Sequence, residues 1–496
     1  MTQIKKTLQP KLVGSIILLS YIFLSCEPPA SDETSDKKPN IIYIMADDLG
    51  YGDLSCYGQE KFSTPNIDRL AERGMLFTQH YAGTTVCAPS RSSLMTGLHT
   101  GHTPVRGNRG MNGGQFPHPE GTTSIASILQ EAGYVTGAFG KWGLGYPGST
   151  GDPMNQGFDQ FVGYISQTIA HNYYPWEIWM NGEVVELEEN RGVQQGLYVP
   201  NLIHEHTLDF IEENQDQPFF LYVPSIIPHA ELFAPDDYME LFLERTNPEP
   251  PYEYTSKFEP EIPYEGIDDP EHPRFKVGGY GSQPHPRAAF AAMVTLLDDQ
   301  VGEIMDKLED LGLMENTLVI FTSDNGPHRE GGADPDFFNS NGPFQGYKRD
   351  LHEGGIRMPM LAQWPAKIEA GAKTDHISAF WDVLPTLAEV AGVEAPERID
   401  GISFLPALMG EPQPQHDYLY WEFHEQGGKQ ALRQGDWKLI RLNVKEGQTR
   451  DLLFDLSSDP GEKNDLSKDH TEKLQELLQI MEGARVEDPE WPFLED

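Results

Sequence analysis

Residues 40–48 read Asn-Ile-Ile-Tyr-Ile-Met-Ala-Asp-Asp and join an uninterrupted apolar run to two acids. A run rich in β-branched and aromatic residues predicts a strand that is covered on both faces. Residues 317–326, Thr-Leu-Val-Ile-Phe-Thr-Ser-Asp-Asn-Gly, repeat this arrangement, and a third run, 135–139, leads into Gly-Lys-Trp-Gly at 140–143. Because open α/β sheets bind ligands beyond the carboxyl ends of their strands, these three ends predict a shared site.

Helical patterns alternate with the strands. Thr123 is the predicted N-cap of a helix over 124–132, which Gly133 ends. Apolar residues recur at helical spacing from Phe290 to Leu311, and Gly312 follows. The order strand–helix–strand predicts an α/β fold, with a large mixed sheet sandwiched by helices. The stretch 231–287 is rich in Pro, Glu and Tyr without a period, and it predicts a long loop region that forms part of a substrate rim.

The pattern changes after residue 410. Short alternating strands are predicted at 418–423, 430–433, 437–440 and 452–456, followed by a helix over about 471–482. These elements predict a small antiparallel sheet packed by one helix. We therefore expect a large domain over 39–410 and a small α+β subdomain over 411–496.

The charge of the chain restricts its partners. Lys plus Arg number 36 against 77 for Asp plus Glu, which gives a formal net charge of −41. Such a surface repels nucleic acid and argues against DNA or RNA binding. An anionic substrate would have to be met by a local cluster of basic side chains.

The N-terminus predicts export. Lysines precede an apolar run over 12–24 that is shorter than a membrane span and fits a signal peptide over residues 1–26. Ser25-Cys26 resembles a bacterial lipobox, which makes Cys26 a candidate lipidation site, with ordinary cleavage as the alternative because Leu24 is bulky there. Residues 27–38 are polar and predict a flexible tether. A periplasmic or cell-surface location follows, with the membrane reached only through a lipid anchor.

The chain has three cysteines, Cys26, Cys56 and Cys87. In an exported protein a Cys56–Cys87 disulfide is one interpretation. Cys87 could equally be a buried structural thiol, a thiolate nucleophile or a modified residue. If Cys26 carries lipid and Cys87 is modified, Cys56 has no partner and should be a free, buried thiol.

The segment around Cys87 is the most specific motif in the sequence. Residues 87–97 follow the pattern C-x-P-S-R-x-x-x-x-T-G. With this motif the chain resembles the type I sulfatases of the alkaline phosphatase superfamily. Within that family it resembles the exported bacterial enzymes that act on carbohydrates. Further landmarks of that family occur in order from about residue 39 to the C-terminus. They are Asp47-Asp48, Gly140-Lys141-Trp142, Pro228-His229, Ser323-Asp324-Asn325-Gly326, Lys348, Glu353-Gly354-Gly355-Ile356-Arg357 and Gly435-Asp436-Trp437-Lys438-Leu439.

The resemblance implies that Cys87 is oxidised to formylglycine (3-oxoalanine) by a formylglycine-generating or anaerobic sulfatase-maturing enzyme. Hydrated, this residue is a geminal diol that attacks sulfur and later expels sulfate by collapsing to the aldehyde. The oxygen donors at the two strand ends suit Ca²⁺ better than Mg²⁺. The predicted metal ligands are Asp47, Asp48, Asp324, Asn325 and residue 87 itself.

The remaining roles follow the same resemblance. Arg91 would hold the diol, and Pro89-Ser90 would open a helix whose N-terminus favours anions. Lys141 and Lys348 would bind sulfate oxygens, and His229 would protonate the leaving alcohol.

One position departs from the family pattern. Many members carry His two residues after the motif lysine, where this chain has Gly143. His171 is the candidate replacement, with a structural role in an aromatic loop as the alternative. The loop 326–334, which includes His328, offers groups for sugar hydroxyls. A sulfated carbohydrate is the expected substrate, and loop resemblance suggests a sugar of the galactose type.

Two other functions remain open at this point. One is phosphoester hydrolysis within the same superfamily, which usually requires two zinc ions and more Asp and His ligands than this chain shows. The other is a lipoprotein that binds sulfated glycans without hydrolysing them, which the glycine at 143 favours.

Overall fold

The computed structural model describes residues 37–247, 250 and 252–493. The described residues from 38 onward form one compact unit. The predicted signal peptide, most of the tether and Cys26 lie outside the described residues. Among the described helices, none is both long enough and apolar enough to cross a membrane.

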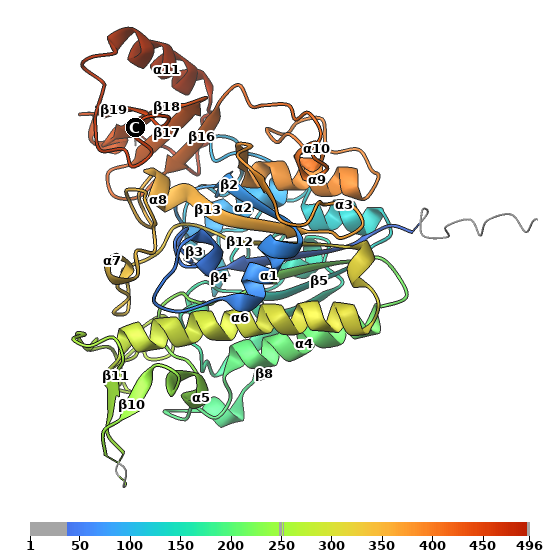
Figure 1. The fold of residues 1–496 in the computed structure, drawn as a ribbon, viewed down its shortest axis with the longest axis vertical. Coiled ribbons are helices and arrows are strands. Elements are labelled where there is room, and N and C mark those ends of the chain that lie inside the picture. The colour runs from blue at the N-terminus through green and yellow to red at the C-terminus, as the bar shows by residue number, and fades with distance from the viewer. Residues whose placement is uncertain (1–36, 248–249, 251, 494–496) are drawn as a thin grey trace, which may run out of the picture. The chain divides into compact units, whose positions relative to one another are not determined.

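A large mixed sheet is the centre of the fold (Figure 1). Across the described residues it has 11 strands in the order β14-β2-β13-β12-β1-β9-β5-β6-β7-β8, with β15 paired to β2. The strands are β1 (Asn40–Ala46), β2 (Met75–Tyr81), β5 (Val135–Lys141), β6 (Gln160–Tyr164), β7 (Glu177–Met180), β8 (Glu183–Glu186), β9 (Phe219–Pro224), β12 (Thr317–Ser323), β13 (Arg357–Gln363), β14 (Ala372–Thr374) and β15 (Ser378–Ala379).

The central strands β12, β1, β9, β5 and β6 run parallel to one another, whereas β13 and β7 flank this group as antiparallel strands. They are buried on both faces, as their apolar sequences predict. Side chains alternate across β1: Ile42 and Ile44 pack into one core cluster, and Ile41, Tyr43 and Met45 pack into another. The two clusters are the two interfaces between the sheet and its covering helices.

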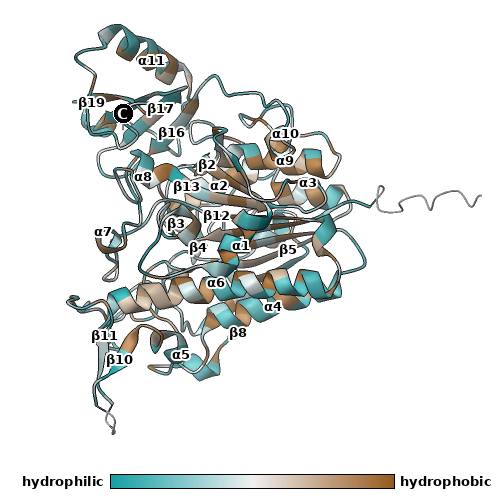
Figure 2. Cartoon of the chain, viewed as in Figure 1, coloured by the Kyte–Doolittle hydropathy of each residue, from teal (hydrophilic) through white to brown (hydrophobic). Residues whose placement is uncertain are grey.

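Helices cover both faces of the sheet, as predicted (Figure 1). Figure 2 shows mostly apolar residues on the central strands, whereas α4 and α6 alternate between apolar and polar residues. One layer contains α1 (Pro65–Arg73), α4 (Val199–Glu213), α5 (Asp236–Met239) and α6 (Pro286–Asp310). The other contains α2 (Cys87–Thr96), α3 (Ile125–Glu131), α9 (Val383–Val390) and α10 (Leu405–Leu408).

Two helix starts differ from the predictions. The N-cap of α3 is Ser124, not Thr123: the Ser124 hydroxyl accepts from the Ser127 N–H at 3.1 Å, and the Ser127 hydroxyl accepts from the Ser124 N–H at 3.0 Å. The helix predicted from Phe290 begins at Pro286, because proline is well suited to the first helical turn.

The segment 231–287 is mainly irregular, as predicted. It carries α5 and a two-stranded sheet of β10 (Leu243–Arg245) and β11 (Tyr254–Ser256). Elsewhere, β3 (Gly110–Met111) pairs with β4 (Gly114–Gln115), and the short helices α7 (Pro335–Phe338) and α8 (Glu353–Ile356) flank the loop before β13.

The small C-terminal sheet is antiparallel, as predicted. It consists of β16 (Leu419–Phe423), β17 (Lys429–Gln434), β18 (Trp437–Leu442) and β19 (Arg450–Asp455), and α11 (Thr471–Gly483) packs on it. Buried Lys438 in β18 donates to the Glu353 carboxylate at 2.8 Å, which ties this sheet to α8. The division at residue 410 stays a prediction.

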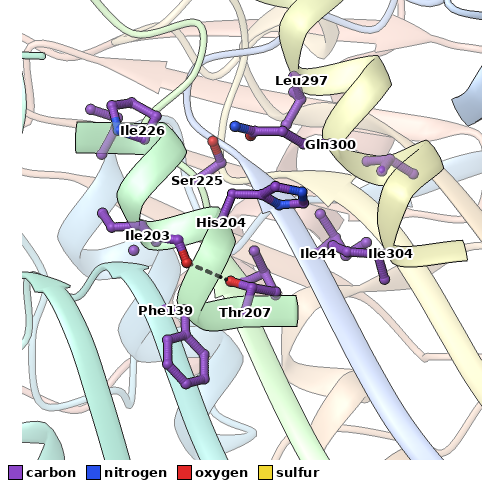
Figure 3. Close-up of a pocket in the computed structure, with 14 residues that line it drawn as sticks. Ile44, Phe139, Ile203, His204, Thr207, Ser225, Ile226, Leu297, Gln300 and Ile304 are labelled. Carbon is purple, nitrogen blue, oxygen red and sulfur yellow. Dashed lines mark hydrogen bonds between the residues drawn. The ribbon is translucent and has the colours of Figure 1, made fainter. Parts of the chain in front are cut away.

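A small apolar cavity of about 30 Å³ lies between the central sheet, α4 and α6 (Figure 3). Its lining includes Phe139, Ile203 and Leu297, and it contains none of the predicted site residues. It has room for only a few water molecules, which is too small for a substrate.

Candidate active site

The predicted site residues come together at the carboxyl ends of the parallel strands. Asp47 follows β1, Asp324 follows β12, Lys141 ends β5, and His229 lies just beyond β9. Each is buried. Residues that are far apart in the sequence thus meet at one edge of the sheet, where α/β folds bind ligands.

The two acids after β1 each pair with a lysine. Lys141 Nζ donates to Asp47 Oδ2 at 2.6 Å, and Lys348 Nζ donates to Asp48 Oδ2 at 2.7 Å. Burial acts to raise the pKa of Asp48, but Lys348, His328 and Lys141 outweigh it and lower that pKa to about 2. The Asp48 carboxylate is therefore held ionised in the interior.

The acid after β12 is bound by Arg91. The guanidinium donates to Asp324 Oδ2 from Nε at 3.1 Å and from Nη2 at 2.8 Å, and it lies 3.6 Å from Asp47. Burial and the neighbouring carboxylate of Asp47 nevertheless raise the pKa of Asp324 to about 6. Burial and the repulsion from Asp47 therefore outweigh the attraction of Arg91 at this carboxyl.

The oxygen donors fit a hard cation. Asn325 Nδ2 donates to Asp48 Oδ1 at 2.6 Å, while its buried Oδ1 has no hydrogen-bond partner among the described residues. An orphaned carbonyl oxygen beside three carboxylates is the donor set that Ca²⁺ prefers. Asp47, Asp48, Cys87 and His229 also place one potential ligand atom each within 4.8 Å of one another. The residues present thus fit a bound divalent cation.

Cys87 is the first residue of α2 and is 2% exposed. Its Sγ donates to Asp47 Oδ1 at 3.6 Å. Burial, only partly offset by Lys141 and Lys348, raises the pKa of this thiol to about 12, so the thiolate that a cysteine nucleophile needs is disfavoured. Cys87 and Cys56 are both free, so the Cys56–Cys87 disulfide interpretation is wrong. Cys56 is only partly buried, unlike the buried thiol that we expected.

Three imidazoles stack at the site. The ring of His229 lies 4.8 Å from that of His171 and 5.5 Å from that of His328. His229 Nε2 is 3.1 Å from Lys348 Nζ, and His328 Nε2 lies 3.1 Å from the Pro228 carbonyl. The structure therefore places all three predicted histidines next to one another at the site, and their individual roles stay predictions.

Burial and nearby positive charge keep the imidazoles of His171 and His229 neutral. Burial and the nearby Lys141 and Lys348 lower the pKa of His171 to about 4. The same causes lower the pKa of His229 well below its usual value. The Nδ1 of His171 has no hydrogen-bond partner among the described residues.

Some side chains of the loop 326–334 lie at the site, and others lie at the surface. Glu330 lies beside His328, with its Oε2 3.6 Å from Nδ1, and pairs with Arg349. Arg329 is itself exposed and pairs instead with exposed Asp336. Only part of the predicted sugar-binding loop is therefore close to the site.

Two further residues, Tyr280 and Gln167, lie beside the predicted site residues. Tyr280, a half-buried residue of the 231–287 region, packs its ring 5.3 Å from His171 and 6.4 Å from His229. Gln167 follows β6 and packs against Gly143. Neither lies in a motif. The only signal for Tyr280 was the tyrosine-rich composition of its region, and there was no signal for Gln167.

The comparisons with known proteins agree with this geometry. The sulfatase family model matches residues 39–393, and the model of the N-sulphoglucosamine sulphohydrolase C-terminal region matches residues 343–486. The chain is 31% identical over 506 residues to the N-acetylgalactosamine-6-O-sulfatase of Bacteroides thetaiotaomicron, covering 91% of this chain and 94% of that protein. It is 32% identical over 503 residues to human arylsulfatase A, with 91% and 87% covered.

Solved structures show the same fold. The structure of Ps i-CgsB in complex with k-i-k-neocarrahexaose matches with a TM-score of 0.73 and 29% identity, covering 90% of this chain and 92% of that one. The phosphonate monoester hydrolase of Agrobacterium radiobacter matches with a TM-score of 0.61 and 20% identity, covering 90% and 95%, and this likeness shows the fold alone. The family match and the relatives together establish that the chain belongs to the sulfatase family, within the alkaline phosphatase-like superfamily, and is a sulfuric ester hydrolase.

Proposed function

We propose that the protein hydrolyses sulfate esters on a sulfated carbohydrate, with a formylglycine made from Cys87 as the nucleophile and one Ca²⁺ at the adjoining acids. The observation that carries the proposal is the position of Cys87. It begins a buried helix, contacts Asp47, and lies near two buried lysines and three carboxylates. Because the thiol is held protonated, an unmodified Cys87 would be a poor nucleophile.

The metal would be held by Asp47, Asp48, Asp324, Asn325 and residue 87. When bound, it would supply positive charge that favours ionisation of the nucleophilic oxygen and offsets the charge of the sulfate. The unpartnered oxygen of Asn325 and the raised pKa of Asp324 support this assignment.

The chain's own residues would carry out the steps. One hydroxyl of hydrated residue 87 gives up its proton and attacks sulfur, and the S–O bond to the sugar breaks; His229, which is neutral at rest, would accept that proton and pass it to the leaving sugar oxygen. The second hydroxyl then loses its proton to a base, for which His171 is the candidate, the C–O bond to sulfate breaks, and the aldehyde returns and is rehydrated. Lys141 and Lys348 face the sulfate oxygens, and Arg91 orients residue 87.

The sugar would lie over the stack of histidines. Tyr280 is half-buried beside His171 and His229, and the Glu330–Arg349 pair is close to Asp48 through His328. An aromatic face next to paired charges is suited to a pyranose with its hydroxyls. The relative from Bacteroides thetaiotaomicron is named for N-acetylgalactosamine 6-sulfate, which supports a sugar of the galactose type.

We further propose that the protein is exported through the signal over residues 1–26 and meets a maturation enzyme that oxidises Cys87. Both proposals rest on the sequence and on the family. Lipidation of Cys26 would anchor the protein to a membrane surface through the tether.

The deciding experiment is mass spectrometry of the Cys87 peptide from protein made in the native host, together with assays on matched sulfate and phosphate esters. We expect the mass of an aldehyde in place of the thiol at Cys87, an unmodified thiol at Cys56 as the control in the same chain, and turnover of the sulfate ester only. An unmodified Cys87 in protein that binds a sulfated glycan without turnover would identify a glycan-binding protein instead. Preferential turnover of the phosphate ester would identify a phosphoesterase.

A further inference from the structure

The backbone at Gly143 leaves space that another residue fills. Gly143 lies two residues after Lys141 and has a φ of 81°. A Cβ at this position would lie 2.6 Å from Nε2 and 2.9 Å from Cγ of Gln167. Any side chain at 143 would therefore collide with the end of Gln167, so the amide of Gln167 occupies the place that a side chain at 143 would take.

The amide of Gln167 lacks a partner. Gln167 is 5% exposed, and its Nε2 makes no hydrogen bond within the part of the chain that the structure describes. Buried donors in folded proteins are nearly always paired, and an unpaired one is unfavourable. An acceptor from outside the chain would remove this defect.

The loop that carries Gln167 borders the site. It follows β6, whose last residue Tyr164 lies opposite Lys141 in the parallel pair of β6 with β5. Four residues beyond Gln167, His171 stacks on His229 and also leaves a buried nitrogen unpaired. One loop thus brings two unsatisfied polar groups to the region of Lys141.

We propose that the Gln167 carboxamide donates a hydrogen bond from Nε2 to a sulfate oxygen of the substrate, as a neutral ligand beside Lys141 and Lys348. This inference rests on the proposed function. The Nε2 group can only donate, which excludes a cation as its ligand. A sulfate oxygen held between two buried ammonium groups is the acceptor that this donor would meet. Gly143 is then required because it makes room for the donor.

The test is the binding of inorganic sulfate, measured by calorimetry in the presence of Ca²⁺ on the Cys87→Ala chain, which does not depend on maturation. Gln167→Met keeps the size of the side chain and removes the donor. We expect sulfate affinity to fall by about 10-fold to 100-fold, the usual effect of losing a hydrogen bond to a charged group. Gln363→Met, which changes a buried glutamine in β13, is the matched control and should bind sulfate like the parent chain.

Gln167→Glu provides a second variant of nearly the same size if the methionine variant does not fold. Its carboxylate should weaken sulfate binding at least as much as methionine does. Unchanged affinity in either folded variant, or no measurable binding by the parent chain, would overturn the inference. Wild-type protein with an unmodified Cys87 and no sulfatase activity would instead refute the proposed function, while the sulfate titration would still decide the role of Gln167.

Discussion

The imidazole ring of His171 lies 4.8 Å from that of His229 and is nearly parallel to it, with an interplanar angle of 10°. The two rings come from loops after different strands, β6 and β9. Because both are buried next to Lys141 and Lys348, protonation of either ring would add a further positive charge beside these two lysines. The ring of His171 is therefore neutral above about pH 4.

We predict that His171→Ala lowers kcat by at least about 10²-fold, the low end for loss of an acid–base group. If His171 accepts the proton when the aldehyde is regenerated, the variant should accumulate sulfated residue 87, detected by mass spectrometry. If it binds the sugar instead, small aryl sulfates should be hydrolysed almost as well as by wild type. Exposed His272 is the control, and a His171 variant as active as His272→Ala on every substrate would show that His171 is structural.

Asp324→Ala should abolish activity and lower the calcium content of the purified protein, because it removes one of the proposed ligands. In wild type, chelation should lower the melting temperature and added Ca²⁺ should restore it, whereas the variant should respond to neither. Circular dichroism tests folding, since Arg91 also loses its partner. Asp336→Ala, which changes an exposed acid in a salt bridge, is the control. Full activity of the Asp324 variant after exhaustive chelation would disprove the metal assignment.

Tyr280→Ala should lower kcat/KM on a sulfated saccharide by about 3- to 10-fold, which is the range expected for one aromatic contact. The decrease should be smaller on an aryl sulfate that lacks the sugar, and Tyr280→Phe should retain most of the activity. Tyr252, an exposed tyrosine of the same 231–287 region, serves as the control. Equal losses on both substrates would mean that Tyr280 supports His171 and does not contact the sugar.

Lys438→Met should lower the free energy of unfolding by about 3–5 kcal/mol, because it removes the buried cation that pairs with both Glu353 and Glu462. The Glu353 carboxylate is buried, and Lys438 with Arg357 outweighs that burial and lowers its pKa to about 2. Chemical denaturation measures the change. Lys473→Met breaks a solvent-accessible pair with Glu476 and should have little effect. Equal stability of the two variants would contradict the prediction.

Stability should decrease as the pH falls below 6.5, partly because of His80. Burial, together with repulsion from His376, lowers the pKa of His80 to about 3. Between pH 6.5 and 3 the unfolded chain therefore binds a proton at this residue and the folded chain does not, which favours unfolding by about 1.4 kcal/mol per pH unit. His80→Leu should show a shallower dependence of the unfolding free energy on pH. An unchanged slope would mean that His80 is protonated in the folded state.

Features encoded by neighbouring residues were predictable from the sequence. The apolar run of β1 and the acids behind it are continuous in the chain, so the strand, its burial and the position of Asp47 follow from local pattern alone. The same holds for β12 and Asp324. Thr123 and Ser124 are adjacent and could each cap the helix, so the local pattern was ambiguous. The hydrogen bonds between Ser124 and Ser127 make Ser124 the N-cap.

Contacts made by loops were not predictable. Gln167 lies in no motif, and its position against Gly143 depends on how the loops after β5 and β6 pack. Tyr280 reaches His171 from a segment more than a hundred residues away in sequence, anchored by the Gly281 N–H, which donates to the buried Glu231 carboxylate at 2.7 Å. Such placements depend on tertiary packing, which composition and spacing do not encode.

The pairing of β1 with β12 also determines when the surroundings of Cys87 can form during synthesis of the chain. Asp47 and Cys87 leave the ribosome early, but the strand that completes their surroundings ends at Ser323. Synthesis of the stretch from 87 to 324 takes roughly 10 to 50 seconds. During that time Cys87 cannot be enclosed, whereas in the folded protein it is only 2% exposed. If Cys87 is oxidised as proposed, its oxidation competes kinetically with folding, and the yield of active enzyme depends on which of the two is faster.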